Sequence, residues 1–499
     1  MGQIGWLGAG EAGDKEQRDV HRPLPLHAVQ VAYRGLKIRA WELIDKLRKA
    51  LGLSGARAYL SILADIAAAE LGADYATALG EALIHAERVY ASRSVAEDYA
   101  KAYKRWLELD RSKLSTKLPG APSPEPEIEV DGEPVVASLF TGAYGLDLGF
   151  ELAGFKTAVA LDISEDSYKN LRANRPKIPF LLGDIKRFST YDILKEAGLK
   201  PGEVDVVTGG PPCQPFSPAG RRQSLSDPRA APLAEFIRVV KEAKPKVFVM
   251  EEVPGILSAR IRHVPLRERG SKRLMPEEEP GSAWRAIVAE LQKTGYKVAW
   301  KVLNAADYGA PQIRERVIVI GVRPDIGRPP VFPRPTHSGD PGGLAGPQDP
   351  WLTLAEAVVG IGDHVGWVEL PPKYARFMRY VPPGGNWRQL PDELKPEAMN
   401  GAYNAGGGRM GFYRRLTWFE PSPTLVTHPA MKATMMVHPW EDRPLSVREY
   451  LRIQGFPDSW KVAVPVGRAY RLFGEAVPVH LAKAVAEAVR DEVLGYSTH

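Results

Sequence analysis

The sequence contains a single cysteine, Cys213, among 499 residues, which excludes an internal disulfide framework and a zinc site built from several cysteines. No apolar run approaches the roughly 18 residues that span a bilayer. The first residues also lack the basic start and apolar centre of a signal peptide. We therefore expect a cytoplasmic protein with no membrane partner and no metal site. Asparagine is scarce as well, while Glu, Arg and Pro are abundant, which is typical of heat-adapted proteins and predicts a thermophilic source.

The formal net charge is +6 and the isoelectric point is near 9.1. This mild excess fits a polyanionic partner such as DNA, although many soluble proteins are equally basic. Residues 1–27 show no periodicity and are expected to form a flexible lead. Residues 28–118 are alanine-rich with apolar residues at helical spacing, which predicts an all-α N-terminal domain. Residues 119–130 are rich in proline and predict a linker.

After the linker, the pattern of the chain changes. Residues 131–323 alternate short β-rich runs with helices, which predicts an α/β fold with a doubly wound, mostly parallel sheet. Residues 324–415 are irregular and rich in Pro and Gly, and a stretch of this length is usually functional or disordered. Residues 416–499 return to ordered patterns and end in a predicted helix.

Polar or glycine-rich segments follow the first three predicted strands, where doubly wound sheets bind ligands. Gly142 and Gly145 allow a tight turn after the first strand. Asp162 ends the second strand and could hold ribose hydroxyls, and Asp184 follows the third and could accept an adenine amino group. Each aspartate alone is more often a helix N-cap. Three such segments in succession favour a nucleoside cofactor.

Cys213 follows the fourth strand, between prolines and a glutamine. A lone cysteine is often a small buried hydrophobe, but the prolines make burial in a strand improbable. A stiff loop that presents a thiol at the ligand edge suits a covalent nucleophile. Glu251 ends the next apolar strand, where burial favours the neutral carboxyl group that can donate a proton.

These segments, together with several others, resemble the DNA (cytosine-5)-methyltransferase family. The resemblance rests on the turn Phe140–Gly145, GGPPCQPFSPAG, MEEVPG, QIRER at Gln312–Arg316, SVREYLRIQGFPDSW and GEAVPV, which occur in the family's order. It covers residues 135–493 and implies the sheet type of the S-adenosylmethionine-dependent methyltransferases. It therefore also implies S-adenosyl-L-methionine as the cofactor and double-stranded DNA as the partner.

The resemblance assigns roles to four residues in catalysis. Cys213 would attack C6 of a flipped-out cytosine, and Glu251 would donate a proton to N3, so that C5 can accept a methyl group. Arg316 would hold O2 of the base, and Arg314 would support the loop and a phosphate. A run of alternating charges such as QIRER is, however, more often a solvated strand.

The family's cofactor residues map onto Phe140, Thr141, Gly142, Gly145, Leu146, Asp162, Ile163, Asp184, Ile185, Pro212 and Val477. The segment 324–415 stands where the family keeps its target-recognition domain, between a catalytic and cofactor-binding domain at 131–323 and its continuation at 416–499. Its arginines are candidates for reading base edges in the major groove: Arg376, Arg379, Arg388, Arg409, Arg414 and Arg415.

The chain departs from the family at several positions. Tyr144 replaces a usual glycine, and Ala-Ala-Pro232 follows Arg229 where the family has leucine. Glu252 and Glu475 replace asparagines, which changes the supporting hydrogen bonds that the family would form there. Two alternatives follow. One is a tRNA cytosine-5 methyltransferase, although that branch usually carries a second cysteine in its variable region. The other is a catalytically weakened DNA-binding regulatory protein.

The resemblance further predicts a restriction-modification or orphan methylase that acts as a monomer on DNA, with a cognate restriction endonuclease as a candidate partner. The N-terminal helices loosely resemble a helix-turn-helix with Gly72 at the turn. The second helix offers Asp74, Tyr75 and Thr77 but no basic residue, which is poor for DNA. We therefore expect these helices to pack within the protein or to bind a partner.

Overall fold

The computed structural model describes residues 43, 46, 47, 51, 56, 59–68, 75–92, 95–108, 133–212, 231–262, 274–339, 348–358, 361, 363–404 and 410–496. The expected flexible lead, the linker at 119–130, Gly72, Cys213 and Arg409 lie outside the described residues.

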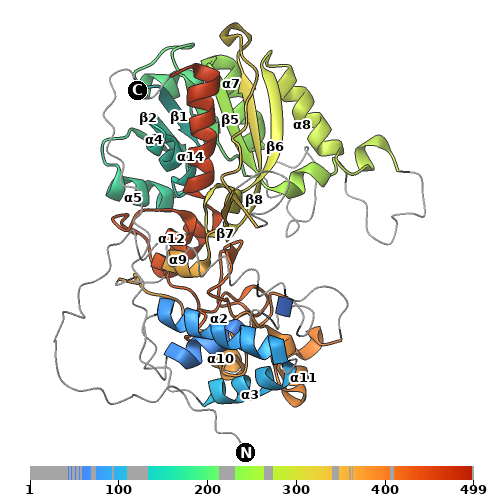
Figure 1. Cartoon of the computed structure of the whole chain (residues 1–499). Coiled ribbons are helices and arrows are strands. Elements are labelled where there is room, and N and C mark those ends of the chain that lie inside the picture. The colour runs from blue at the N-terminus through green and yellow to red at the C-terminus, as the bar shows by residue number, and fades with distance from the viewer. Residues whose placement is uncertain are drawn as a thin grey trace, which may run out of the picture.

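A seven-stranded sheet forms the upper half of the molecule (Figure 1). The strands are β1 (Val135–Leu139), β2 (Lys156–Asp162), β3 (Phe180–Leu182), β4 (Val206–Gly209), β5 (Val247–Glu252), β6 (Lys297–Asn304) and β8 (Glu315–Val322). Their order is β3-β2-β1-β4-β5-β8-β6. The first five strands are parallel, and β8 runs antiparallel to both β5 and β6. The predicted mostly parallel, doubly wound sheet is therefore confirmed.

Helices cover both faces of the sheet. Successive side chains of a strand point to opposite faces, and most of them are apolar here, so both faces must be covered. On one face, Val136 and Val206 pack with α4 (Gly145–Leu152) and α14 (Val479–Ala488). On the other face, the strands pack against α6 (Thr190–Glu196), α7 (Ala231–Ala243) and α8 (Ser282–Gln292). The helix α5 (Glu165–Asn174) follows β2.

A pair of short strands joins the sheet half of the molecule to the lower half. The short strand β7 (Gln312–Ile313) pairs with β11 (Ser422–Pro423). The remaining elements after the sheet are β9 (His337–Ser338), β10 (Asp349–Pro350), α9 (Leu354–Val358), α10 (Pro372–Met378), α11 (Lys395–Met399), α12 (Val447–Gln454), α13 (Val466–Glu475) and a π-helical turn, Val489–Leu494. Residues 363–440 overlap the target-recognition domain expected at 324–415, and we call them the recognition segment for this position in the chain.

The recognition segment has its own small core, in which Phe377, Met399, Tyr413 and Val437 are buried together. Little regular structure occurs in it, as its Pro and Gly content predicted.

The N-terminal helices lie beside this segment in the lower half of the molecule (Figure 1). They comprise residues 59–68, α2 (Tyr75–Ser92) and α3 (Val95–Leu107). The helical character expected for the N-terminal region is therefore present in the residues that the structure describes.

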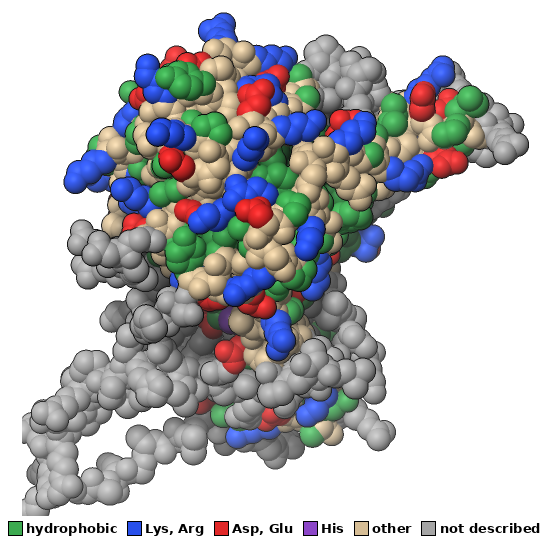
Figure 2. All heavy atoms as spheres, turned by 90° about the horizontal axis from the view of Figure 1, so that it is seen from above, with side chains coloured by type: hydrophobic (Ala, Val, Ile, Leu, Met, Phe, Trp, Pro, Cys, Tyr) green, Lys and Arg blue, Asp and Glu red, His purple; other side chains and the backbone are tan. Residues whose placement is uncertain are grey.

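Charged side chains are dispersed over the upper half of the molecule. Seen from above, Lys and Arg alternate with Asp and Glu across the described surface (Figure 2). The mild positive charge of the chain is thus not concentrated on that face. No helix among the described residues has the length and apolar character that a membrane span requires.

Candidate active site

The carboxyl ends of five neighbouring strands bring most of the predicted site residues to one edge of the sheet. Phe140 follows β1, Asp162 ends β2, and Asp184 lies two residues after β3. Pro212 follows β4, and Glu251 is the penultimate residue of β5. This is the edge at which doubly wound sheets bind ligands, so the structure brings together what the sequence placed apart.

The turn after β1 is held by the carboxylate of Asp162. Its Oδ2 accepts from the Gly142 backbone N–H at 2.8 Å, and its Oδ1 accepts from the Ser164 N–H at 2.7 Å. Burial raises the pKa of Asp162, and these backbone hydrogen bonds oppose that shift. A carboxylate has about four acceptor positions, so it can still receive two ribose hydroxyls.

Ile163, directly after Asp162, leaves 69% of its surface exposed. A large apolar side chain open to solvent beside the carboxylate of Asp162 fits the flat face of an adenine ring.

Asp184, by contrast, caps the 3₁₀ turn that follows it, because its Oδ1 accepts from the Lys186 N–H at 3.0 Å. Thr141, Leu146 and Ile185 are buried and support these turns from below. The residues present therefore fit a nucleoside cofactor.

Tyr144 explains why a glycine is usual at its position. Its φ is 77°, in the left-handed region that costs a residue with a Cβ about 1–2 kcal/mol. The side chain is fully buried, donates to the Glu151 carboxylate, lies 2.8 Å from the Thr157 hydroxyl, and stacks on Trp460 with ring centroids 6.0 Å apart. Packing of the large ring compensates for the backbone strain.

Val477 reaches the same turn from the other end of the chain. A Cβ on Gly145 would lie 2.3 Å from the Val477 carbonyl oxygen, so only glycine allows this approach. The contact fixes the beginning of α4 against the segment that precedes α14. Val477 thus lies beside the turn that follows β1.

Glu251 and Arg316 form an ion pair at the end of β5, with Oε1 2.5 Å from Nε. Only 13% and 11% of the two side chains are exposed. A Cβ on Gly210 would lie 3.0 Å from Oε2 of Glu251, so this glycine keeps the carboxylate accessible beside β4. In the sequence, the glycine pair before Pro211 is the signal for this close approach.

The predicted alternative for QIRER, a solvated charged strand, is wrong. Gln312, Arg314 and Arg316 are at most 9% exposed, whereas the apolar Ile313 is 39% exposed. The Arg314 guanidinium donates to the carbonyl oxygens of Gly474 at 2.9 Å and Leu425 at 3.3 Å. Arg314 therefore joins the sheet half to two later segments of the chain and does not face solvent.

The two glutamates that replace asparagines lie in different surroundings. Glu252 is 3% exposed at the end of β5, and its Oε2 accepts from the Val253 N–H at 3.3 Å. The Glu475 side chain is 62% exposed at the end of α13, 3.7 Å from Arg471. Glu252 is thus buried at the end of β5, and Glu475 is open to solvent.

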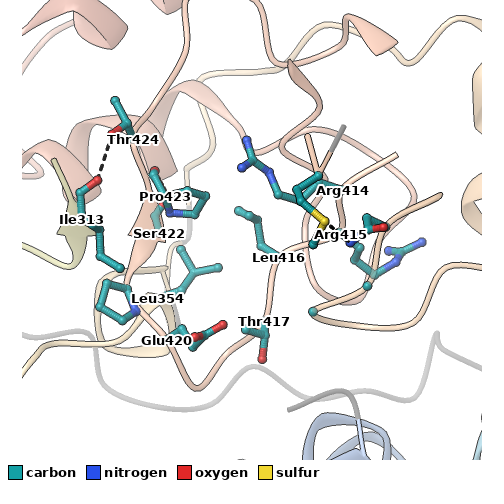
Figure 3. A pocket seen from close by; sticks show the side chains of 15 residues that line it. Ile313, Leu354, Arg414, Arg415, Leu416, Thr417, Glu420, Ser422, Pro423 and Thr424 are labelled. Carbon is teal, nitrogen blue, oxygen red and sulfur yellow. Dashed lines mark hydrogen bonds between the residues drawn. The ribbon is translucent and has the colours of Figure 1, made fainter. Parts of the chain in front are cut away.

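A cavity of about 360 Å³ lies where β7 and α9 meet the recognition segment (Figure 3). Thr424 donates to the Ile313 carbonyl oxygen at 2.9 Å on one side. Arg414, Thr417 and Asn386 line other parts of the wall. Sequence reasoning did not identify this cavity, because its walls come from four separate segments.

Two adjacent arginines of the recognition segment have opposite roles. Arg415 is 1% exposed and donates to the carbonyl oxygens of Val381, Met378 and His438 at 2.7–3.0 Å. The expectation that Arg415 reads base edges is wrong, because backbone carbonyls occupy its guanidinium. Arg414 lines the cavity, and its one hydrogen bond within the described residues runs from Nε to the Met435 carbonyl oxygen at 3.2 Å.

The other described arginines of this segment lie at its surface. Arg376 pairs with Glu397, Arg379 lies over the Tyr380 ring, and Arg388 lies over Trp387.

No group of three or more His, Cys, Asp or Glu side chains suited to a metal occurs in the part of the chain that the structure describes.

Comparisons with known proteins identify the same segments. Residues 135–338 and 387–491 match the family described as C-5 cytosine-specific DNA methylase. The chain is 38% identical over 362 residues to the Type II methyltransferase M.PspPI of Psychrobacter sp. (strain TA137), covering 71% of this chain and 78% of the relative. It is 35% identical over 354 residues to M.Sau96I of Staphylococcus aureus, covering 71% and 75%. It is 36% identical over 364 residues to M.Eco47II of Escherichia coli, covering 71% and 78%.

Proposed function

The chain belongs to the C-5 cytosine-specific DNA methylase family and is a DNA (cytosine-5)-methyltransferase; we propose that it acts on a cytosine flipped out of a short, specific duplex sequence, through a covalent bond from Cys213. The observation that carries this proposal is the ion pair of Glu251 and Arg316 beside Gly210. Cys213 follows Gly210 by three residues in the sequence and lies outside the described residues.

The reaction needs a nucleophile because C5 of cytosine is unreactive on its own. The Cys213 thiolate adds to C6 while Glu251 donates a proton to N3, and the electron pair of the C5–C6 bond becomes available at C5. S-adenosylmethionine, when bound, supplies a methyl group activated by its sulfonium. A water molecule takes the C5 proton, the C5–H electron pair re-forms the C5–C6 double bond, and the S–C6 pair leaves with the Cys213 thiolate. N3 returns its proton to Glu251.

Arg316 holds O2 of the entering base in this proposal. Its Nε lies 2.5 Å from Oε1 of Glu251, so the residue that binds O2 and the residue that serves N3 stand side by side. O2 and N3 are neighbouring positions on the cytosine edge, and the ion pair therefore orients the carboxyl group of Glu251 toward N3 when O2 is bound.

The turn after β1 and the ends of β2 and β3 would hold the cofactor. Asp162, which already accepts from the Gly142 N–H, would receive the ribose hydroxyls, and the exposed Ile163 would cover one face of the adenine. Asp184 is left with one carboxylate oxygen beyond its capping bond for the adenine amino group. The other members of the site are Phe140, Thr141, Gly142, Gly145, Leu146, Ile185, Pro212 and Val477.

Duplex DNA lies, in this proposal, between the carboxyl edge of the sheet and the recognition segment. Base flipping is required because the reacting atoms are otherwise inside the base stack. The cavity beside β7 opens on this region, and the terminal nitrogens of Arg414 can donate to a guanine edge or to a phosphate. The likeness to relatives named Type II methyltransferases supports a role in restriction-modification, paired with an endonuclease.

Trapping on 5-fluorocytosine tests the covalent step, because fluorine at C5 blocks the final elimination. We expect a duplex pool containing 5-fluorocytosine and S-adenosylmethionine to give an adduct that survives denaturing electrophoresis, and Cys213→Ala to give none. An adduct on tRNA with none on duplex DNA would instead favour the tRNA methyltransferase. Sequence-specific binding of DNA without adduct or methylation would favour the regulatory protein.

A further inference from the structure

The N-terminal helices share a hydrophobic core with the recognition segment. Leu60, Leu63 and Trp106 are buried in the same cluster as Trp418 and Trp440. Figure 1 shows these helices lying along the lower half beside the later segments. The family match begins only at residue 135, so this contact is an addition to the family's common part.

Asp65 lies at the centre of the contact and is completely buried. One carboxylate oxygen accepts from Trp106 Nε1 of α3 at 2.7 Å, and the other accepts from Trp440 Nε1. A buried carboxylate is costly unless donors are directed at it, so the position of each indole relative to the other is strongly determined. The Trp440 ring in turn packs edge-on against Trp418, with centroids 4.9 Å apart.

Two further polar contacts run from the helices to the cavity wall or to a residue near it. The hydroxyl groups of Ser61 and Thr417 are 2.9 Å apart and buried, and Thr417 lines the cavity. The Tyr103 hydroxyl donates to the carbonyl oxygen of Tyr380, four residues before Gly384 of the cavity wall.

The contacted segments lead directly to Arg414. The Gly384 N–H donates to the Leu416 carbonyl oxygen at 3.1 Å, and the Arg415 N–H donates to the Gly385 carbonyl oxygen at 3.0 Å. A shift of Tyr380 or Thr417 would therefore be transmitted to both sides of the cavity that holds Arg414.

We propose that Ser61, Asp65 and Tyr103 are positioning residues through which the N-terminal helices set the geometry of the DNA-reading cavity. This inference rests on the proposed contact of the cavity with DNA. The helices contribute to the affinity and selectivity for duplex DNA without touching it, whereas they leave the chemistry at Cys213 and the binding of cofactor unchanged.

The test compares Tyr103→Phe with Tyr99→Phe as a matched control. Tyr99 lies one turn earlier on α3, and its ring stacks on Tyr103 with centroids 6.5 Å apart. No hydrogen bond of its hydroxyl group occurs within the described residues, so the control removes the same atom without touching the recognition segment. Ser61→Ala and Asp65→Asn complete the set; the new amide of the latter directs an N–H at one of the two indoles.

The variants are compared by selection from a pool of duplexes with a randomised window, by kinetics on the same pool, and by binding of S-adenosylhomocysteine. We expect Tyr103→Phe and Ser61→Ala to raise KM for DNA about 3–10-fold, and Asp65→Asn more. The preference for the selected sequence over single-base changes should fall, while kcat and affinity for S-adenosylhomocysteine remain within about twofold. Tyr99→Phe should match the wild type in each measurement.

Each outcome decides between separate claims. If Tyr103→Phe, Ser61→Ala and Asp65→Asn select the same sequences with the same preference as the wild type, the positioning role is wrong. If they lower kcat and cofactor affinity equally with DNA affinity, the helices stabilise the protein generally and the inference also fails. A wild type that selects a DNA sequence without methylating it would overturn the proposed function alone.

Discussion

Gly149 of α4 lies so close to Ala482 of α14 that a Cβ added to it would be 2.3 Å from the Ala482 Cβ. We expect Gly149→Ala to force the two helices apart and to lower the free energy of unfolding by about 1–3 kcal/mol or more. Gly467→Ala is the matched control, because nothing lies within 4 Å of its added Cβ in α13. Chemical denaturation of both variants checks this expectation, and equal midpoints would contradict the close packing.

Tyr144→Gly separates backbone strain from packing. The change would relieve about 1–2 kcal/mol of left-handed strain, but it would remove a fully buried aromatic ring, which costs about 3–5 kcal/mol. The lost packing energy should exceed the relieved strain, so we expect a net loss of stability, measured by thermal unfolding. A variant as stable as the wild type would mean that the strain is larger than these magnitudes allow.

Asp147 makes stability depend on pH near neutrality. Burial raises its pKa to about 7, and hydrogen bonds from Ser138 and Thr208 only partly oppose this shift. Because the folded pKa exceeds the unfolded value of about 3.9, the stabilising contribution is complete below pH 4. It is lost as the pH rises through 7. We expect Asp147→Asn to be more stable than the wild type at pH 8, with a smaller difference at pH 5. Parallel unfolding curves across this range would show that the carboxyl group does not titrate there.

Cys213→Ser should abolish methyl transfer while leaving the fold and most of the DNA affinity intact. A serine hydroxyl is far less ionised than a thiol near neutral pH, so the attack on C6 fails. Single-turnover methylation and a binding assay on the same duplex pool measure the two properties. Methyl transfer within tenfold of the wild type would rule out the covalent route.

Arg414→Ala and Arg415→Ala test two neighbouring residues with different surroundings. The first removes a cavity side chain and should weaken DNA binding about tenfold, with little change in the unfolding midpoint. The second leaves several backbone carbonyl oxygens without their donor and should destabilise the recognition segment by about 3 kcal/mol or more. Similar effects of the two changes on stability and binding would contradict this assignment.

The sheet and the edge that carries the site were predictable because their signals are local. Alternating β-rich runs and helices predict a parallel sheet, and strand ends then collect Asp162 and Glu251 at one edge. The burial of Arg314 and Arg415 was not predictable. Their partners are carbonyl oxygens from distant segments, which leave no trace in residue type or spacing.

The N-terminal helices were predicted as helices, but their partner was not. The helical spacing of apolar residues predicts that one face of each helix is buried, but it does not indicate which part of the protein covers that face. The tryptophans that meet Asp65 come from residues 106 and 440, and no local pattern connects those positions.

The packing of α14 on α4 also has a consequence for how the protein is made. The turn after β1 and α4 are translated well before α14, yet they need α14 to cover their apolar face. A nascent chain would therefore expose that face while the rest is synthesised, and contacts so distant in sequence form slowly. We expect the sheet half to become protease-resistant only after the C-terminal helix has left the ribosome, and chaperones to hold the unfinished chain until then.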